Sequence, residues 1–250
     1  MGAVTFSLDL ALVTELTKAL PLEVFAETGT FHGDTIDMVR DIFPEIHSVE
    51  LSTDYYNVTC ERFSELTHIE LVNGDSATAL AKWSLMFGDR SALYFLDAHW
   101  CVAENSAGKA SQCPLLSELK AINRINEHSL IVIDDARLFL APPPAPHEIS
   151  HWPSFDEISK QLASMSCSHK TMVVNDCIVF FPPSVEMVLQ NYAYNHGVDW
   201  LAAMSKVRDY DNLRSQFNQG LVHLEAKEKM IQHLKSICDE REALIKRLSR

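Results

Sequence analysis

Five short apolar runs alternate with segments of helical periodicity through the first 135 residues, and this alternation constrains the fold more than any other feature of the sequence. Each run is continuously apolar, which is typical of strands buried on both faces of a sheet. Parallel neighbours of this kind need right-handed crossover helices. The sequence therefore predicts an α/β fold with a Rossmann-like, doubly wound and mostly parallel sheet. The expected strands are 23–27, 46–51, 69–72, 92–96 and 130–133, and the expected helices are 8–19, 33–42, 53–66, 76–87 and 114–126.

The pattern changes after Asp135. A proline-rich stretch at 141–146 predicts a stiff, exposed connection, and a further helix is expected at about 153–164. Two apolar runs at 171–174 and 177–181 flank Asn175-Asp176, a two-residue turn that predicts an antiparallel hairpin closing the sheet.

The last 45 residues form a different kind of segment. Apolar residues recur there with heptad spacing, which predicts a long C-terminal helix that forms a coiled coil, although a lone amphipathic helix would show a similar stripe. We expect a domain at 1–205 and a helical segment at 206–250 that mediates homo-oligomerisation or attachment to a further domain. The pattern reaches Arg250 without a helix-stop signal, so we expect it to continue in a longer polypeptide. The stripe consists of Leu213, Phe217, Leu224, Ile231, Leu234, Cys238, Ile245 and Leu248.

Charge and composition narrow the classes of partner. The formal net charge is −13, and residues 1–205 carry 11 Lys and Arg against 27 Asp and Glu. Such an acidic body repels phosphate backbones, so we expect no nucleic-acid partner. The sequence contains no run of about 20 apolar residues, so no membrane span is predicted. The N-terminus lacks the basic region of a signal peptide. The six cysteines form no zinc-binding pattern, so a cytoplasmic location with mostly reduced thiols is expected.

Polar residues follow the first three strands, at the sheet edge where nucleotide folds bind their ligand. Strand one runs into Glu27-Thr28-Gly29-Thr30-Phe31-His32-Gly33, where Gly29 allows a sharp turn and Gly33 allows close packing of helix and strand. Glu50 ends strand two and can accept hydrogen bonds from both hydroxyls of a ribose. Asp75 follows strand three and can accept from an adenine amino group while it caps the next helix. The loop contains no Lys or Arg to hold a phosphate, so we expect a nucleoside ligand without a pyrophosphate.

These features resemble class I S-adenosylmethionine-dependent methyltransferases over residues 23–181, and the closing hairpin belongs to the same resemblance. It implies that the first loop surrounds the methionine part of the cofactor, that Glu50 binds the ribose and that Asp75 with Ser76 lies at the adenine edge. Two alternatives stay open: Glu27 could interact only with a helix dipole, and Asp75 could be only an N-cap. The implied cofactor-binding residues are Glu27, Thr28, Gly29, Thr30, Phe31, Gly33, Thr35, Glu50, Asp75, Ser76 and Asp97.

Strands four and five also end in carboxylates, at Asp97 and at the pair Asp134 and Asp135. Three carboxylates on one rim repel one another unless a cation or a proton neutralises them, and oxygen ligands suit Mg²⁺. The arrangement resembles metal-dependent O-methyltransferases of the catechol and macrocin types, and the stretch from Leu96 to Leu119 resembles bacterial glycan-associated methyltransferases. The resemblance implies that Asp97, Asp134 and Asp135 bind a divalent cation. Helix caps and loop hydrogen bonds are the alternative role for these acids.

His99 lies two residues beyond Asp97, and we expect it to be the general base, with Asp97 as the second catalytic residue. The catechol type has a lysine near that position, and this chain has none there, so a structural role for His99 stays open. The loop 101–113 is long and polar and is expected to cover the site. Cys101 and Cys113 could pair across that loop, and His147, His151 and Trp152 could line the acceptor pocket.

The predicted function is O-methylation, from S-adenosylmethionine and assisted by Mg²⁺, of a hydroxyl on a sugar, a glycan or a glycosylated metabolite. A metal-free methyltransferase acting on a small molecule is one alternative. A degenerate methyltransferase fold that serves as an oligomerisation or scaffold module is another. A dinucleotide-dependent oxidoreductase is the competing prediction for the fold, but the loop lacks the third glycine of that motif.

Overall fold

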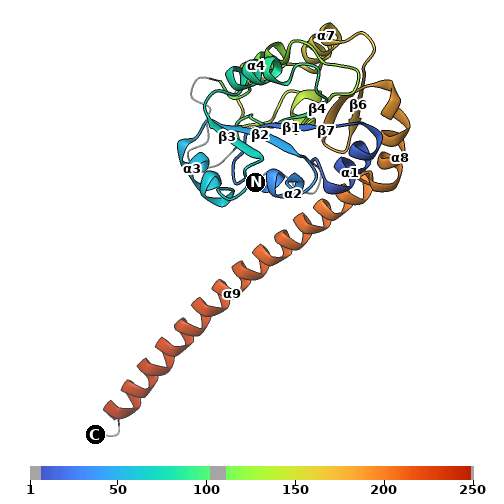
Figure 1. The fold of residues 1–250 in the computed structure, drawn as a ribbon. Coiled ribbons are helices and arrows are strands. Elements are labelled where there is room, and N and C mark those ends of the chain that lie inside the picture. The colour runs from blue at the N-terminus through green and yellow to red at the C-terminus, as the bar shows by residue number, and fades with distance from the viewer. Residues whose placement is uncertain (1–6, 102–110, 249–250) are drawn as a thin grey trace. The chain divides into compact units, whose positions relative to one another are not determined.

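The computed structural model describes residues 7–101 and 111–248. The chain divides into two compact units, Met1–Gly197 and Val198–Arg250. The first contains a layered α/β domain and the second a single long helix, and each is described by itself (Figure 1).

The described strands form one sheet of seven, in the order β3-β2-β1-β4-β5-β7-β6. The first five are parallel neighbours, and β7 runs antiparallel to both β5 and β6. The predicted doubly wound sheet with a closing hairpin is therefore confirmed. The strands are β1 Val24–Thr28, β2 Glu45–Glu50, β3 Ile69–Asn73, β4 Ala92–Leu96, β5 Leu130–Ile133, β6 Lys170–Val174 and β7 Cys177–Phe181.

Helices cover both faces of this sheet (Figure 1). The helices that connect the strands or flank the sheet are α1 Leu10–Ala19, α2 Asp34–Val39, α3 Thr53–Arg62, α4 Ser76–Phe87, α5 Leu115–Ile122, α6 Arg137–Leu140, α7 Phe155–Met165 and α8 Glu186–His196, with short 3₁₀ turns at Ile149–His151 and Pro183–Val185. One apolar cluster packs α4, α5 and α7 against one face, and a second packs α1, α2 and α8 against the other. Strand β4 is buried along its whole length because it lies at the centre of the sheet.

The observed helices differ from the predicted ones mainly at their ends. Helix α5 stops at Ile122 because Asn123 adopts a positive φ of 58°. Helices α6 and α8 were not predicted. Helix α8 packs against α1, where the Tyr192 hydroxyl donates a 2.5 Å hydrogen bond to Asp9.

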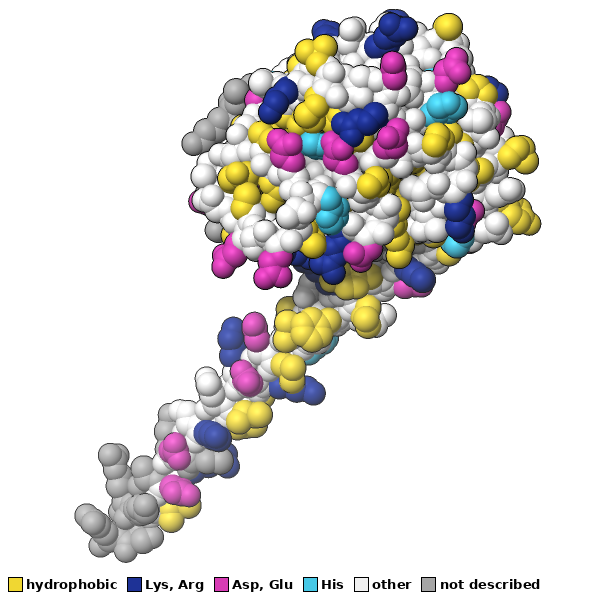
Figure 2. All heavy atoms as spheres, viewed as in Figure 1, with side chains coloured by type: hydrophobic (Ala, Val, Ile, Leu, Met, Phe, Trp, Pro, Cys, Tyr) yellow, Lys and Arg dark blue, Asp and Glu magenta, His cyan; other side chains and the backbone are white. Residues whose placement is uncertain are grey.

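The second unit contains α9, which spans Trp200–Leu248 and so begins six residues before the predicted boundary at 206. Its described side chains are almost all exposed, including those of Leu213, Phe217, Leu224 and Ile231 from the predicted stripe. Figure 2 shows apolar side chains along this helix. The side chain of Cys238 lies outside the described residues. None of the described helices is long and apolar enough to cross a membrane.

Candidate functional site

The site lies at the carboxyl edge of the sheet, where the loops after β1, β2, β4 and β5 meet. The register of the strands brings these loops together, since Thr28 pairs with Val49 of β2 and with Leu96 of β4, and Leu96 pairs with Ile133 of β5. The residues that follow these strands are therefore neighbours, as the sequence analysis expected.

Two glycines set the course of the first loop. Gly29 has φ +84°, and a Cβ atom there would lie 2.4 Å from the carbonyl oxygen of Asp97, so the β1 and β4 loops touch through their backbones. Gly33 has φ +78°, and a Cβ atom there would lie 2.6 Å from the ring of Phe63. The sharp turn predicted for Gly29 matches its positive φ, whereas Gly33 allows close packing against the C-terminal end of α3 and not against a strand.

Glu50 binds the first loop to strand two. One of its carboxylate oxygens accepts from the backbone N–H of Phe31 at 2.8 Å, and the other accepts from that of Ser52 at 2.8 Å. Each oxygen keeps a second lone pair for a further donor, such as a ribose hydroxyl. The Phe31 ring packs on Tyr55 of α3, with ring centroids 4.5 Å apart.

Glu27 is buried beneath the loop in a hydroxyl network. Ser48 donates to its carboxyl at 2.6 Å and lies 2.6 Å from the Thr30 hydroxyl, and Thr35 also hydrogen-bonds to Glu27. Burial raises the pKa of Glu27 to about 8, although the hydrogen bonds from Ser48 and Thr35 oppose the shift. A carboxyl held this way takes up or releases a proton near neutral pH.

The residues after strand three form the next part of the site. Asp75 caps α4, since its Oδ1 accepts from the Thr78 backbone N–H at 2.8 Å and the Thr78 hydroxyl at 2.7 Å. Its side chain is exposed, so Oδ2 remains on the surface of the site. Ser76 is buried and hydrogen-bonds to Glu118 of α5, which also bonds Thr28.

Glu118 is a residue that sequence analysis did not assign to the site. Its side chain is buried, and burial raises its pKa to about 7. Its Oε1 is buried without a hydrogen-bond partner among the described residues. Helical spacing alone gave no sign of this, because the contacts to Thr28 and Ser76 arise only when α5 packs beside α4.

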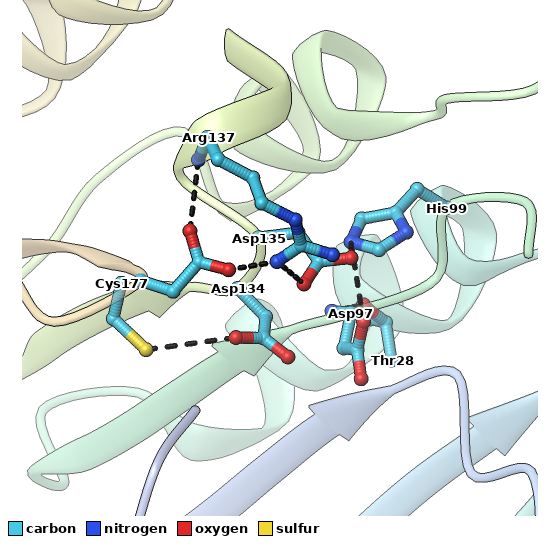
Figure 3. Close-up of polar contacts among 8 residues, drawn as sticks. Thr28, Asp97, His99, Asp134, Asp135, Arg137 and Cys177 are labelled. Carbon is cyan, nitrogen blue, oxygen red and sulfur yellow. Dashed lines mark hydrogen bonds and ion pairs between the residues drawn. The ribbon is translucent and has the colours of Figure 1, made fainter. Parts of the chain in front are cut away.

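Asp97 and His99 lie together at the end of β4, as predicted (Figure 3). The His99 Nε2 atom is 3.2 Å from Asp97 Oδ1 and 3.4 Å from Asp135 Oδ2, but neither contact has hydrogen-bond geometry. Burial raises the pKa of Asp97 well above its usual value, and burial lowers the pKa of His99. Both groups thus favour their neutral forms, and a neutral imidazole is the form that accepts a proton.

The acid pair after β5 is divided between two environments. Asp134 is buried and accepts from the thiol of Cys177 at 3.6 Å, and burial raises its pKa to about 6. Asp135 has a positive φ of 55° and is bound by Arg137, whose Nη1 lies 2.5 Å from its Oδ1. Figure 3 shows Asp134 directed toward Cys177 and Asp135 toward Arg137.

The predicted metal ligands do not fit a divalent cation in this arrangement. Among residues 7–101 and 111–248, no group of three His, Cys, Asp or Glu side chains has the geometry to hold a metal ion. Asp97, Asp134 and Asp135 are near neighbours, but Asp134 and Asp135 are held by different protein partners. The expectation of a shared Mg²⁺ is therefore not supported by the positions of these side chains.

An aromatic wall stands beside His99. The Trp152 ring lies 5.5 Å from His99, 5.0 Å from His147 and 5.7 Å from Phe139, measured between centroids. Trp152 also donates through Nε1 to Gln112 at 3.0 Å. Of the three predicted acceptor-pocket residues, Trp152 packs beside His99, and His147 packs on Trp152. His151 has no ring contact to either among the described aromatic pairs.

The predicted lid loop starts and ends at this wall. The Trp100 backbone N–H donates to the Gln112 carbonyl at 2.7 Å, which joins the two ends of the loop. Residues 102–110, on which the lid prediction mainly depends, lie outside the described part of the chain. Cys113 is a buried free thiol, so no disulfide joins it to Cys101.

No protein-family model matches the chain, and no curated protein matches its sequence. Among solved structures, DesVI of Streptomyces venezuelae is similar with 8% identity and a TM-score of 0.47, over 72% of this chain and 93% of that one. The S-adenosylmethionine-bound CalS10 of Micromonospora echinaspora, an amino pentose methyltransferase, is similar with 12% identity and a TM-score of 0.43, over 68% and 89%. The N-methyltransferase NodS of Bradyrhizobium japonicum shows 8% identity and a TM-score of 0.41, over 68% and 90%. Likeness at this level concerns the fold, so the function proposed below rests on the geometry of the site.

Replacing Gly29 should disrupt the contact between the β1 and β4 loops. We expect Gly29→Ala to lower the stability by about 2 kcal/mol or more, because alanine is strained at positive φ and its Cβ meets the Asp97 carbonyl. Gly74→Ala is the matched control, since nothing lies within 4 Å of a Cβ atom there. Thermal unfolding measures both variants, and equal melting temperatures would contradict the proposed loop contact.

Glu27 should make stability depend on pH. Its folded-state pKa is raised, so the folded protein retains a proton that the unfolded chain loses, and stability falls as pH rises from about 4.5 to about 8. Because glutamine does not ionise, we expect Glu27→Gln to be more stable than the parent by at least about 1 kcal/mol at pH 8, with little difference below pH 4.5. Urea unfolding of both proteins across this range tests it, with Glu15→Gln, at an exposed position on α1, as the control. A stability difference that does not change with pH would refute the assignment.

Proposed function

We propose that this protein is an S-adenosylmethionine-dependent methyltransferase that methylates a hydroxyl of a sugar-bearing acceptor, with His99 as the general base. The observation that carries the proposal is the contact between the glycine turn after β1 and Glu50 after β2, made through the Phe31 backbone N–H. It places an acidic residue with spare lone pairs beside a loop whose backbone a ligand can approach closely.

The cofactor fits this half of the site by charge and by shape. The loop from Glu27 to Gly33 contains no Lys or Arg, which suits a nucleoside that carries a sulfonium in place of phosphates. Glu50 would accept from the ribose hydroxyls, and Asp75 Oδ2 would accept from the adenine amino group. Glu27 lies under the loop that would surround the cationic methionine part, and its ionised form would be stabilised by that charge.

The chemistry requires only a positioned nucleophile and a base. The acceptor oxygen would attack the methyl carbon in line with the carbon–sulfur bond, that bond would break, and the sulfonium would become a neutral thioether. His99 would take the hydroxyl proton through its imidazole, which favours the neutral form here. Asp135, whose Oδ2 lies 3.4 Å from His99 Nε2, would stabilise the imidazolium that results.

The aromatic wall supports a sugar-bearing acceptor. The partly exposed His147 ring packs on the buried Trp152 ring, which lies 5.5 Å from His99. An exposed ring face can pack on the apolar face of a sugar while nearby polar groups bind its hydroxyls. Magnesium is not part of the proposed mechanism, since the three predicted ligands do not converge.

We infer in addition that α9 associates with a second copy of itself. Described apolar side chains at heptad spacing are more than half exposed on α9, among them Phe217, Leu224 and Ile231. An exposed stripe of this kind is stabilised when a second stripe covers it. The segment 206–250 carries 10 basic and 7 acidic residues, so two copies would not repel each other strongly.

Titration with S-adenosylhomocysteine and an acceptor screen test the proposed function. We expect saturable calorimetric binding to the parent protein and the same affinity for His99→Gln, because His99 does not contact the nucleoside. With nucleotide sugars, free sugars and glycosides as acceptors and radiolabelled methyl donor, the variant should lose about 100- to 10,000-fold in rate. The absence of any binding at millimolar ligand would contradict the cofactor assignment, and full activity of His99→Gln would contradict the base.

Association through α9 is tested by light scattering after size exclusion. We expect the parent chain to be oligomeric and Leu224→Glu to be monomeric, since a charge in the apolar stripe is costly to bury. Val222→Glu is the matched control, because Val222 is also exposed, at 66% against 59% for Leu224, but lies outside the stripe. A monomeric parent, or an equal loss in both variants, would overturn this inference.

A further inference from the structure

Arg137 lies between Asp135, which follows β5, and Asp176, which lies in the turn between β6 and β7. It is the first residue of α6, and its Nη1 lies 2.5 Å from Asp135 Oδ1 and also contacts Asp176 Oδ2 (Figure 3). Neither Arg137 nor Asp176 was predicted to belong to the site.

Asp176 fixes Arg137 in two ways. Its Oδ1 accepts from the Arg137 backbone N–H at 2.9 Å, while its other oxygen binds the guanidinium. Its backbone carbonyl accepts from the Ala136 N–H at 2.7 Å. Asp176 is buried in the turn between β6 and β7, so the closing hairpin holds both the start of α6 and its arginine.

The predicted metal ligands Asp134 and Asp135 already have partners within the protein. Asp135 faces Arg137 with one oxygen and His99 with the other, at 3.4 Å. Asp134 accepts from the Cys177 thiol on β7. The Arg137 side chain thus already compensates the charges of Asp135 and Asp176, and no group of three carboxylates among the described residues could hold a metal ion.

We propose that Arg137, fixed by Asp176, takes the place of a divalent cation at this acid cluster, so that the site operates without a bound metal. The part of this inference that concerns turnover rests on the proposed function, whereas the part that concerns charge and metal binding does not. Arg137 is a positioning residue, which holds Asp135 beside the imidazole of His99.

The difference between the two cations has a chemical consequence. A guanidinium does not dissociate or accept the lone pair of an acceptor hydroxyl as a metal ion does, so the proton must go to a protein base. His99 is the neighbouring group that can take it, at 3.4 Å from Asp135. Half of the Arg137 side chain remains exposed, and its contacts to both acids use Nη1.

Titration with Mn²⁺ alone tests the metal-binding part on the full chain. Electron paramagnetic resonance of free Mn²⁺ should show no stoichiometric site in the parent protein below about 1 mM, against the tight carboxylate sites that bind such ions. A stoichiometric site that is lost in Asp97→Asn or Asp134→Asn would overturn the proposal.

Two substitutions at Arg137 separate its charge from its hydrogen bonds. Arg137→Gln removes the charge but keeps a side-chain donor, and Arg137→Lys keeps the charge. We expect Arg137→Gln to melt several degrees below the parent and to recover on addition of Mn²⁺, and Arg137→Lys to stay closer to the parent with no response to Mn²⁺.

Arg40→Ala, which removes an exposed arginine paired with Asp37 at 2.9 Å, is the control. If Arg137→Gln matches Arg40→Ala in melting temperature and in its lack of response to Mn²⁺, Arg137 does not act as the cation of the cluster. If Arg137→Gln does not fold, Arg137→Lys and the titration of the parent decide the question.

Activity and cofactor binding distinguish this inference from the proposed function. Removal of metals with EDTA should leave the methylation rate of the parent unchanged, and a rate restored only by Mg²⁺ would overturn the inference while leaving the methyltransferase assignment intact. Failure to bind S-adenosylhomocysteine would contradict the proposed function, and the Mn²⁺ results would still stand.

Discussion

The burial of carboxyl groups at one edge of the sheet is the constraint on which the rest of the site depends. Glu27, Glu118 and Asp134 are buried there, and burial raises the pKa of each. Unpaired buried carboxylates are costly, so the fold must supply hydroxyl donors, a fixed cation or protons. Ser48 and Thr35 hydrogen-bond to Glu27, and Thr28 and Ser76 hydrogen-bond to Glu118. The Cys177 thiol donates to Asp134, and Arg137 pairs with Asp135.

The parallel sheet explains why these acids meet. Strand register puts the ends of β1, β2, β4 and β5 side by side, and Gly29 lets two of the following loops touch through their backbones. The same arrangement concentrates negative charge, which a cationic ligand would relieve. Buried carboxyl groups lower the stability of the free protein, and a bound ligand would compensate them. Such a site is expected where binding matters more than stability.

Much of this could be predicted from the sequence, because the signals were local. The bounds of β4, β5 and β7 follow directly from continuous apolar runs, and Glu27, Glu50 and Asp97 follow from their places at strand ends. The pairing of Arg137 with Asp176 could not be predicted, since it joins residues 39 positions apart through the hairpin turn. Glu118 was missed for the same reason: its partners Thr28 and Ser76 belong to other elements. The predicted metal site is not supported, because the position of a residue at a strand end does not determine the direction of its side chain. The side chain of Asp134 turns toward Cys177.

Under the proposed function, the acid-rich edge also bears on the order of events in a turnover. The sulfonium is a cation before transfer and a neutral thioether afterwards, so attraction to Glu27 and its neighbours weakens once the methyl group has left. The proton on His99 then adds positive charge beside Asp97 and Asp135 at 3.2 and 3.4 Å. Charge therefore moves from the cofactor half of the site to the acceptor half during the reaction. Carboxyl groups lie in both halves, so the site stabilises the positive charge before and after transfer without rearrangement of the sheet.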